Sequence, residues 1–197
     1  MINLYLDTFF DRTCMLTEIT DKDYLLAKNH SIWSETKQSQ YGKGLANTNS
    51  DPSKVTRIGT LGEIAFGNII NQSVDFTYRV NGDKQDFIVN NITVDIKTST
   101  KMRSTCYILY ETEKGKIIKP EKDIYILAHI LYDNLNENSA AIVFSGYYTN
   151  KMLESCIIRD GAYNAGHKNL VLDVEKSLSF LDFINVYTKR RIKVWLN

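Results

Sequence analysis

The stretch of sequence that decides the fold reads GDKQDFIVNNITVDIKT and runs from Gly82 to Thr98. Two segments rich in Val, Ile and Phe flank the pair Asn90-Asn91. Asparagine tolerates the positive φ angles of a two-residue type I′ turn, although Asn-Gly is the more common pair. The stretch therefore predicts a β-hairpin with strands over residues 86–89 and 92–98.

The register of this hairpin separates apolar from polar side chains. With the two asparagines as the turn, Val89 faces Ile92, and the pairs that follow place Asp86 opposite Asp95. One face then carries Phe87, Val89, Ile92, Val94 and Ile96. The other face carries Asp86, Ile88, Thr93, Asp95 and Lys97. A slip of one residue would mix the two sets, so the pattern itself supports the register.

The polar face predicts a metal-dependent hydrolytic site. Cross-strand carboxylates at Asp86 and Asp95 would have Cβ atoms ~5 Å apart and would repel without a cation between them. Mg²⁺ prefers carboxylate oxygens and retains several waters. Lys97 points to the same side and could hold a phosphate oxygen or orient an attacking water. The simpler alternative is a solvated strand face with a cross-strand ion pair, because Asp-x-Lys triplets are common by chance.

The arrangement resembles the PD-(D/E)xK nuclease superfamily, which includes restriction endonucleases, Holliday junction resolvases and phage exonucleases. The resemblance rests on Asp86, the hairpin and the triplet Asp95-Ile96-Lys97. It implies an α/β (α+β) fold of the restriction-endonuclease-like kind, with a central mixed sheet flanked by helices. It also implies a Mg²⁺ cofactor, for which Mn²⁺ substitutes, bound by Asp86 and Asp95. Gln85 stands where the motif often has Pro.

The superfamily often adds a glutamate from a helix before the sheet, and Glu63 in the segment Gly59–Phe66 matches it. The resemblance implies that Glu63 is a catalytic residue and a metal ligand. A competing account makes Thr60 and Glu63 a capping box at the start of a helix. No Gln follows Gln85, which argues against the recB-like branch of the superfamily.

Periodicity and turn residues predict the remaining elements. Expected helices are 21–34, 60–70, 149–154 and 174–187, and expected strands are 74–80, 107–110, 123–132, 140–145 and 169–172. Residues 35–57 are expected to be a polar loop. We expect one structural domain, with residues 1–58 as a helical extension and residues 59–197 as the nuclease-like core. His129 lies in an apolar strand and is expected to be buried.

Composition limits the binding partners that we expect for this chain. The net charge of +1 gives no global basic field, so contacts with an anionic partner must be local. Candidate nucleic-acid contacts are Lys43, Lys54, Arg57, Lys101 and Arg103. Three widely spaced cysteines favour reduced thiols. No segment predicts a membrane contact, so we expect a cytoplasmic protein, in the host cytoplasm if a phage or mobile element encodes it.

The leading functional hypothesis is a Mg²⁺-dependent DNA endonuclease, with RNA left open as substrate and a homodimer left open as assembly. A resolvase or exonuclease of the same fold is the alternative within enzymes. A catalytically silent module that binds nucleic acid or protein is the alternative outside them. An unrelated interaction protein would predict that Asp86 and Asp95 lie far apart.

Overall fold

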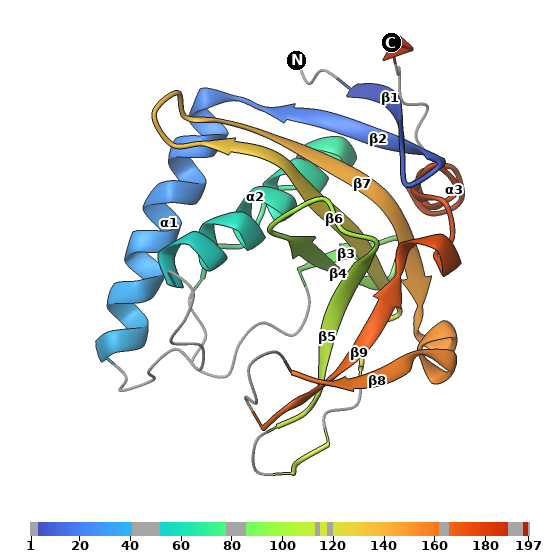
Figure 1. The fold of residues 1–197 in the computed structure, drawn as a ribbon. Coiled ribbons are helices and arrows are strands. Elements are labelled where there is room, and N and C mark those ends of the chain that lie inside the picture. The colour runs from blue at the N-terminus through green and yellow to red at the C-terminus, as the bar shows by residue number, and fades with distance from the viewer. Residues whose placement is uncertain are drawn as a thin grey trace.

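The structure is a computed structural model that describes residues 4–40, 52–77, 86–112, 115–117, 120–161, 166–188 and 195–196. These residues form an α+β protein with two sheets (Figure 1). The seven-stranded main sheet has the order β10 (Trp195–Leu196), β1 (Leu4–Phe9), β2 (Arg12–Ile19), β7 (Ser139–Thr149), β6 (Ile124–Asn134), β4 (Ile92–Ser99) and β3 (Phe87–Val89). The three-stranded small sheet has the order β5 (Thr105–Glu111), β9 (Lys168–Asp173) and β8 (Ile157–Asp160).

The main sheet is mixed. Its pairs are antiparallel except for β4 with β6 and β1 with β10, which are parallel. The helical segments are α1 (Asp21–Gln40), α2 (Pro52–Ile70), α3 (Phe180–Phe183), the 3-10 turns Asn150–Ser155 and Val174–Lys176, and the π turn Ile184–Thr188. The prediction of an α+β fold with a mixed sheet is confirmed.

The main sheet lies between two cores, and strand β6 shows both. Its residues Ile124, Ile126 and Ala128 belong to the core that α1, α2 and α3 cover. The alternate residues Tyr125 and Leu127 belong to a second core beneath the small sheet. Figure 1 shows α1 and α2 beside each other, and β5, β9 and β8 grouped away from them. The hairpin β3–β4 lies at one edge of the main sheet. Because its apolar residues belong to the helical core, its polar face lies on the same side of the sheet as the second core.

Residues 4–40 and 52–58 are part of this fold, and the prediction of a helical extension missed the two strands in them. Strands β1 and β2 lie in the main sheet, and β2 pairs with β7. Their turn places Phe10 and Asp11 at φ 55°, without the asparagine or glycine that normally signals a type I′ turn. The hairpin could not be predicted because its turn lacks these residues.

The polar loop expected over residues 35–57 is wrong at both ends, and its middle, residues 41–51, lies outside the described residues. Helix α1 extends to Gln40, and α2 begins at Pro52, eight residues before the predicted start at Thr60. Proline is well suited to the first turn of a helix because its missing N–H has no intrahelical partner there. Pro52 thus marks the start of α2, although proline in a polar stretch usually indicates a loop.

Most later elements match their predictions, with two exceptions. Residues 74–77 form no strand, and the rest of the strand expected over 74–80 lies outside the described residues. The helix expected over 174–187 is divided into a 3-10 turn, the short α3 and a π turn. Ser177 separates the first two, with an extended backbone at ψ 155°.

His129 is fully buried on β6, as expected. Its Nε2 lies 2.7 Å from Ser145 Oγ, and the ring of Phe10 packs against the imidazole at 5.0 Å between centroids. Burial lowers the pKa of His129 to about 4, because the charged imidazolium would lose its hydration. The folded protein therefore holds His129 neutral at pH values where the unfolded chain protonates it.

We expect the His129→Gln variant to lose part of the acid sensitivity of folding. Between pH 6.5 and about 4 the unfolded state binds the additional proton, so this contribution to stability is complete above that window and lost as the pH falls through it. The loss is on the order of 3 kcal/mol for the wild type. Urea unfolding at both ends of the window measures it. An identical pH dependence in wild type and variant would contradict the account.

Candidate active site

The hairpin has the predicted register. Residues Phe87, Ile88 and Val89 of β3 pair with Val94, Thr93 and Ile92 of β4. Asn90 and Asn91 have φ values of 49° and 66°, which are those of a type I′ turn. Both asparagines accept the left-handed conformation at small cost, and their twist suits the flanking strands.

The two faces of the hairpin also separate as predicted. Phe87, Val89, Val94 and Ile96 are each at most 6% exposed and lie in the core beneath the helices. On the opposite face, Ile88 is exposed and Thr93 is partly exposed. Alternation along β4 therefore directs Asp95 and Lys97 away from the helical core.

Asp86 stands directly before β3 and bonds the residues on either side of Asp95. Its backbone N–H donates to the carbonyl of Val94 at 3.2 Å. Its Oδ2 accepts the N–H of Ile96 at 2.6 Å. The Asp86 side chain thus extends the hydrogen bonding between the two strands past the end of β3. This places the carboxylate of Asp86 beside Asp95. The expectation of two distant aspartates is therefore wrong.

Asp95 and Lys97 form an ion pair on β4. Lys97 Nζ lies 2.5 Å from Asp95 Oδ2, and the side chains are 32% and 13% exposed. Oδ2 is buried, and Lys97 is the charged partner that the described residues place beside it. Tyr125 lies beside Asp95 on β6, and its pKa is raised to about 12, by burial first and then by the negative charge of Asp95. Among the described residues, the charge partner of Asp95 is therefore a partly exposed ammonium.

Such a position fits a hard divalent cation. Mg²⁺ prefers carboxylate oxygens and would take the place of the Lys97 ammonium beside Asp95 Oδ2. Asp86 would supply a second carboxylate from the adjoining position. Mg²⁺ sites commonly use only one or two protein carboxylates and complete the shell with water.

Helix α2 approaches the hairpin from the opposite face. A Cβ on Gly62 would come within 2.0 Å of Thr98 Oγ1, so only glycine permits this contact between α2 and β4. Thr98 alternates with Lys97 and therefore shares the face of Val94 and Ile96. The contact fixes how closely α2 packs against the strand that carries the acid–lysine pair.

Glu63 follows Gly62 and is partly exposed. The capping-box account of it is wrong, because Thr60 lies in the middle of α2 and not at its start. Among the residues that the structure describes, no group of three or more His, Cys, Asp and Glu side chains is placed to hold a metal ion. The catalytic and metal-binding roles of Glu63 therefore stay predictions.

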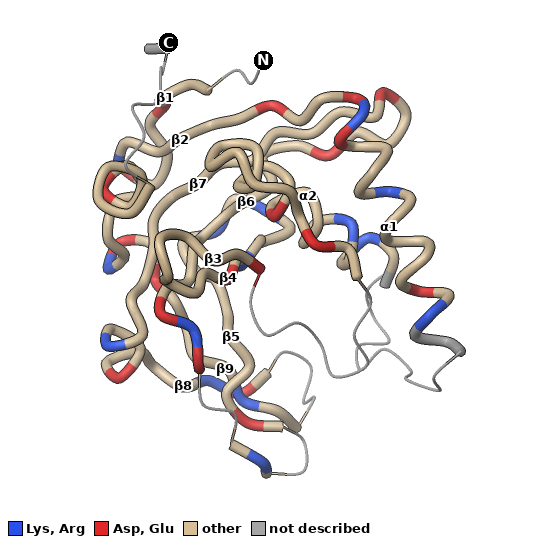
Figure 2. Tube along the Cα trace, turned by 180° about the vertical axis from the view of Figure 1, so that it is seen from behind, with Lys and Arg blue, Asp and Glu red and all other residues tan. Residues whose placement is uncertain are grey.

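The five candidate nucleic-acid contacts have different positions. Arg57 is 5% exposed and its guanidinium binds Asp133 at 2.7 Å, so the prediction of a surface phosphate contact is wrong for it. Lys54, Lys101 and Arg103 are exposed. Lys43 lies outside the described residues. Figure 2 shows acidic and basic residues interspersed along the fold, in keeping with the small net charge.

Two residues near the hairpin have roles that sequence reasoning missed. Asp123 accepts hydrogen bonds from the N–H and the hydroxyl of Thr93, and these lower the pKa of its carboxyl. Tyr107 on β5 lines a pocket that Lys97 and Arg103 also line. Neither contact could be predicted from nearby sequence, because each depends on which strands lie next to β4 in the fold.

The fold and the site together define an α+β protein with a carboxylate–lysine site at a hairpin of its mixed sheet. Comparison with family models, with curated proteins and with solved structures gave no match for the chain. In the part of the chain that the structure describes, no helix has both the length and the apolar character needed to cross a membrane.

Proposed function

We propose that this protein is a Mg²⁺-dependent nuclease of the restriction-endonuclease-like fold that hydrolyses phosphodiester bonds of DNA in the cytoplasm. The observation that carries the proposal is the adjacency of Asp86, Asp95 and Lys97 at one end of the hairpin. This is the arrangement that the PD-(D/E)xK pattern implies. The mixed sheet supports the proposal as well, although a small sheet and not helices covers its second face.

The residues have separate tasks in this proposal. Asp86 and Asp95 would hold the cation, which supplies Lewis-acid stabilisation of the phosphoryl oxygens and lowers the pKa of water. Lys97, released from Asp95, would bind a non-bridging phosphate oxygen and orient the attacking water. One new bond forms between the water oxygen and phosphorus as one P–O ester bond breaks. The attacking water releases one proton to solvent, and the leaving oxygen takes one proton from solvent.

The cleavage test uses supercoiled plasmid, linear duplex, single strand and a four-way junction, each with Mg²⁺ or with EDTA. We expect Mg²⁺-dependent products, and the preferred substrate separates an endonuclease, an exonuclease and a resolvase. Products that form equally in EDTA, or the absence of products from every substrate with Mg²⁺ and with Mn²⁺, would overturn the proposal. In the second case, binding without cleavage would identify a catalytically silent module.

A further inference from the structure

The pocket beside Lys97 joins the candidate active site to the small sheet. It has a volume of about 230 Å³, and its lining includes Lys97 and Ser99 of β4, Arg103 of the connecting segment, and Thr105 and Tyr107 of β5. Small-molecule sites usually span ~300–1,000 Å³, so this pocket suits a smaller group, such as a single unit of a polymer. Lys97 reaches both Asp95 and this pocket.

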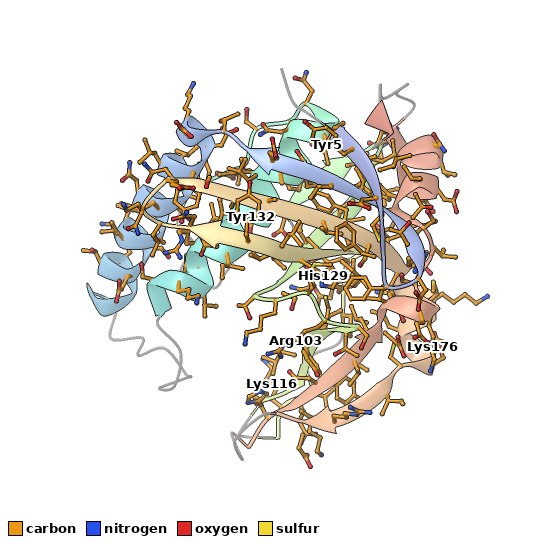
Figure 3. The ribbon with its side chains drawn as sticks, turned by 45° about the horizontal axis from the view of Figure 1, so that its top comes forward. Tyr5, Arg103, Lys116, His129, Tyr132 and Lys176 are labelled. Carbon is orange, nitrogen blue, oxygen red and sulfur yellow. The ribbon has the colours of Figure 1, made fainter. Side chains whose placement is uncertain are left out.

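The pocket offers positive charge and an aromatic ring together. Arg103 is exposed, and no carboxylate among the described residues forms an ion pair with it. Tyr107 is 45% exposed on the outer face of the small sheet, where the hydroxyl of Thr105 lies 3.3 Å from its Oη. Figure 3 shows Arg103 at the junction of the main and small sheets. Two basic residues and an exposed tyrosine that line one pocket suit the phosphate and the base of one nucleotide.

A second exposed tyrosine provides the contrast. Tyr132 on β6 is 43% exposed, almost as much as Tyr107. Its pKa is raised by burial and then by the charges of Glu18 and Glu137, so its surroundings are acidic and would repel phosphate. Figure 3 shows Tyr132 well away from Arg103, farther along β6. The two rings therefore have similar exposure but opposite electrostatic surroundings.

We infer that the pocket of Lys97, Arg103 and Tyr107 holds one unpaired nucleotide, so that the substrate is single-stranded where it is cut. The inference rests on the proposed nuclease function and names its substrate class. Arg103 binds the phosphate next to the scissile one, and the base of that nucleotide stacks on Tyr107. A base in a duplex has both faces covered by its neighbours, so stacking on Tyr107 requires an unpaired end, flap or single strand.

The test measures binding in EDTA, where cleavage does not interfere, by the fluorescence anisotropy of labelled oligothymidylate and of a labelled duplex. We expect the wild type to bind the single strand more tightly than the duplex. Tyr107→Ala should weaken single-strand binding about 5- to 100-fold, and Tyr107→Phe should retain it, because stacking on an aromatic ring is lost only in the first. Tyr132→Ala is the matched control and should bind as the wild type does.

Arg103→Ala should weaken binding of the single strand and reduce the slope of log affinity against log salt by about 0.7. An oligouridylate measured in parallel separates DNA from RNA, which share the phosphate and the stacking face. Equal losses in Tyr107→Ala and Tyr132→Ala, or tighter binding of the duplex by the wild type, would overturn the inference. The result is independent of cleavage, so a failure of the proposed function would be visible separately in the Mg²⁺ assay.

Discussion

Lys97→Ala is expected to reduce Mg²⁺-dependent cleavage about 100- to 1,000-fold while the fold remains intact. The ammonium is the one positive charge that the structure shows at Asp95, at 2.5 Å, and in the proposal it binds the phosphate as negative charge develops there. Removing a single preorganised group that stabilises such charge typically costs this factor in the rate. The Lys97 side chain is 32% exposed, so its truncation leaves no large cavity in the core.

The matched control for this variant is Lys168→Ala. Lys168 also lies on a strand and also binds a carboxylate, that of Glu111 at 2.8 Å, but it is on the small sheet away from the hairpin. Initial rates of cleavage on the preferred substrate, with far-ultraviolet circular dichroism of each variant, separate chemistry from folding. Full activity in Lys97→Ala, or an equal loss in Lys168→Ala, would contradict the assignment of Lys97.

Asp133→Ala is expected to cause a large loss of stability, about 3–5 kcal/mol in the free energy of unfolding. Asp133 binds the guanidinium of Arg57 at 2.7 Å and the hydroxyl of Tyr24 at 2.5 Å. Its removal leaves a guanidinium that is 5% exposed without a counter-charge. Because these residues come from β6, α2 and α1, the variant loosens both helices from the sheet.

Urea unfolding near neutral pH measures this loss. The control is Glu111→Ala, which breaks the more exposed pair with Lys168 and should therefore destabilise the protein far less. A double variant, Arg57→Met with Asp133→Leu, should recover much of the stability, because it leaves no unpaired buried charge. If Asp133→Ala and Glu111→Ala destabilise the protein equally, the Arg57–Asp133 pair does not have the role described.

The hairpin could be predicted from sequence because its information is local. Two asparagines mark the turn, and strict alternation on both sides of it allows one register. Positions such as Arg57 could not be predicted in this way. Its partner Asp133 is 76 residues away in the sequence, so a basic residue in a polar stretch resembled a surface contact. The contact became internal only when α2 packed beside β6.

The candidate site likewise contains residues that local sequence predicts and residues whose positions depend on packing between distant elements. Asp86, Asp95 and Lys97 follow from the register of one hairpin. The position of Glu63 depends on how α2 crosses the sheet, and that is set by the close contact of Gly62 with Thr98. The role of Tyr107 depends on β5 lying next to β4, which no local pattern specifies. Sequence alone therefore predicts the acid–lysine pair but not the surface that would bind the substrate around it.

Metal binding by the two aspartates tests the central claim most directly. Isothermal titration of the intact protein with Mn²⁺ requires no knowledge of the substrate. We expect a binding isotherm for the wild type and none for Asp95→Asn, whose amide keeps the shape of the side chain but loses its charge. Asp123→Asn, a carboxylate bound to Thr93 outside the site, should titrate as the wild type does. The same isotherm in wild type and Asp95→Asn, or none in either, would contradict the account.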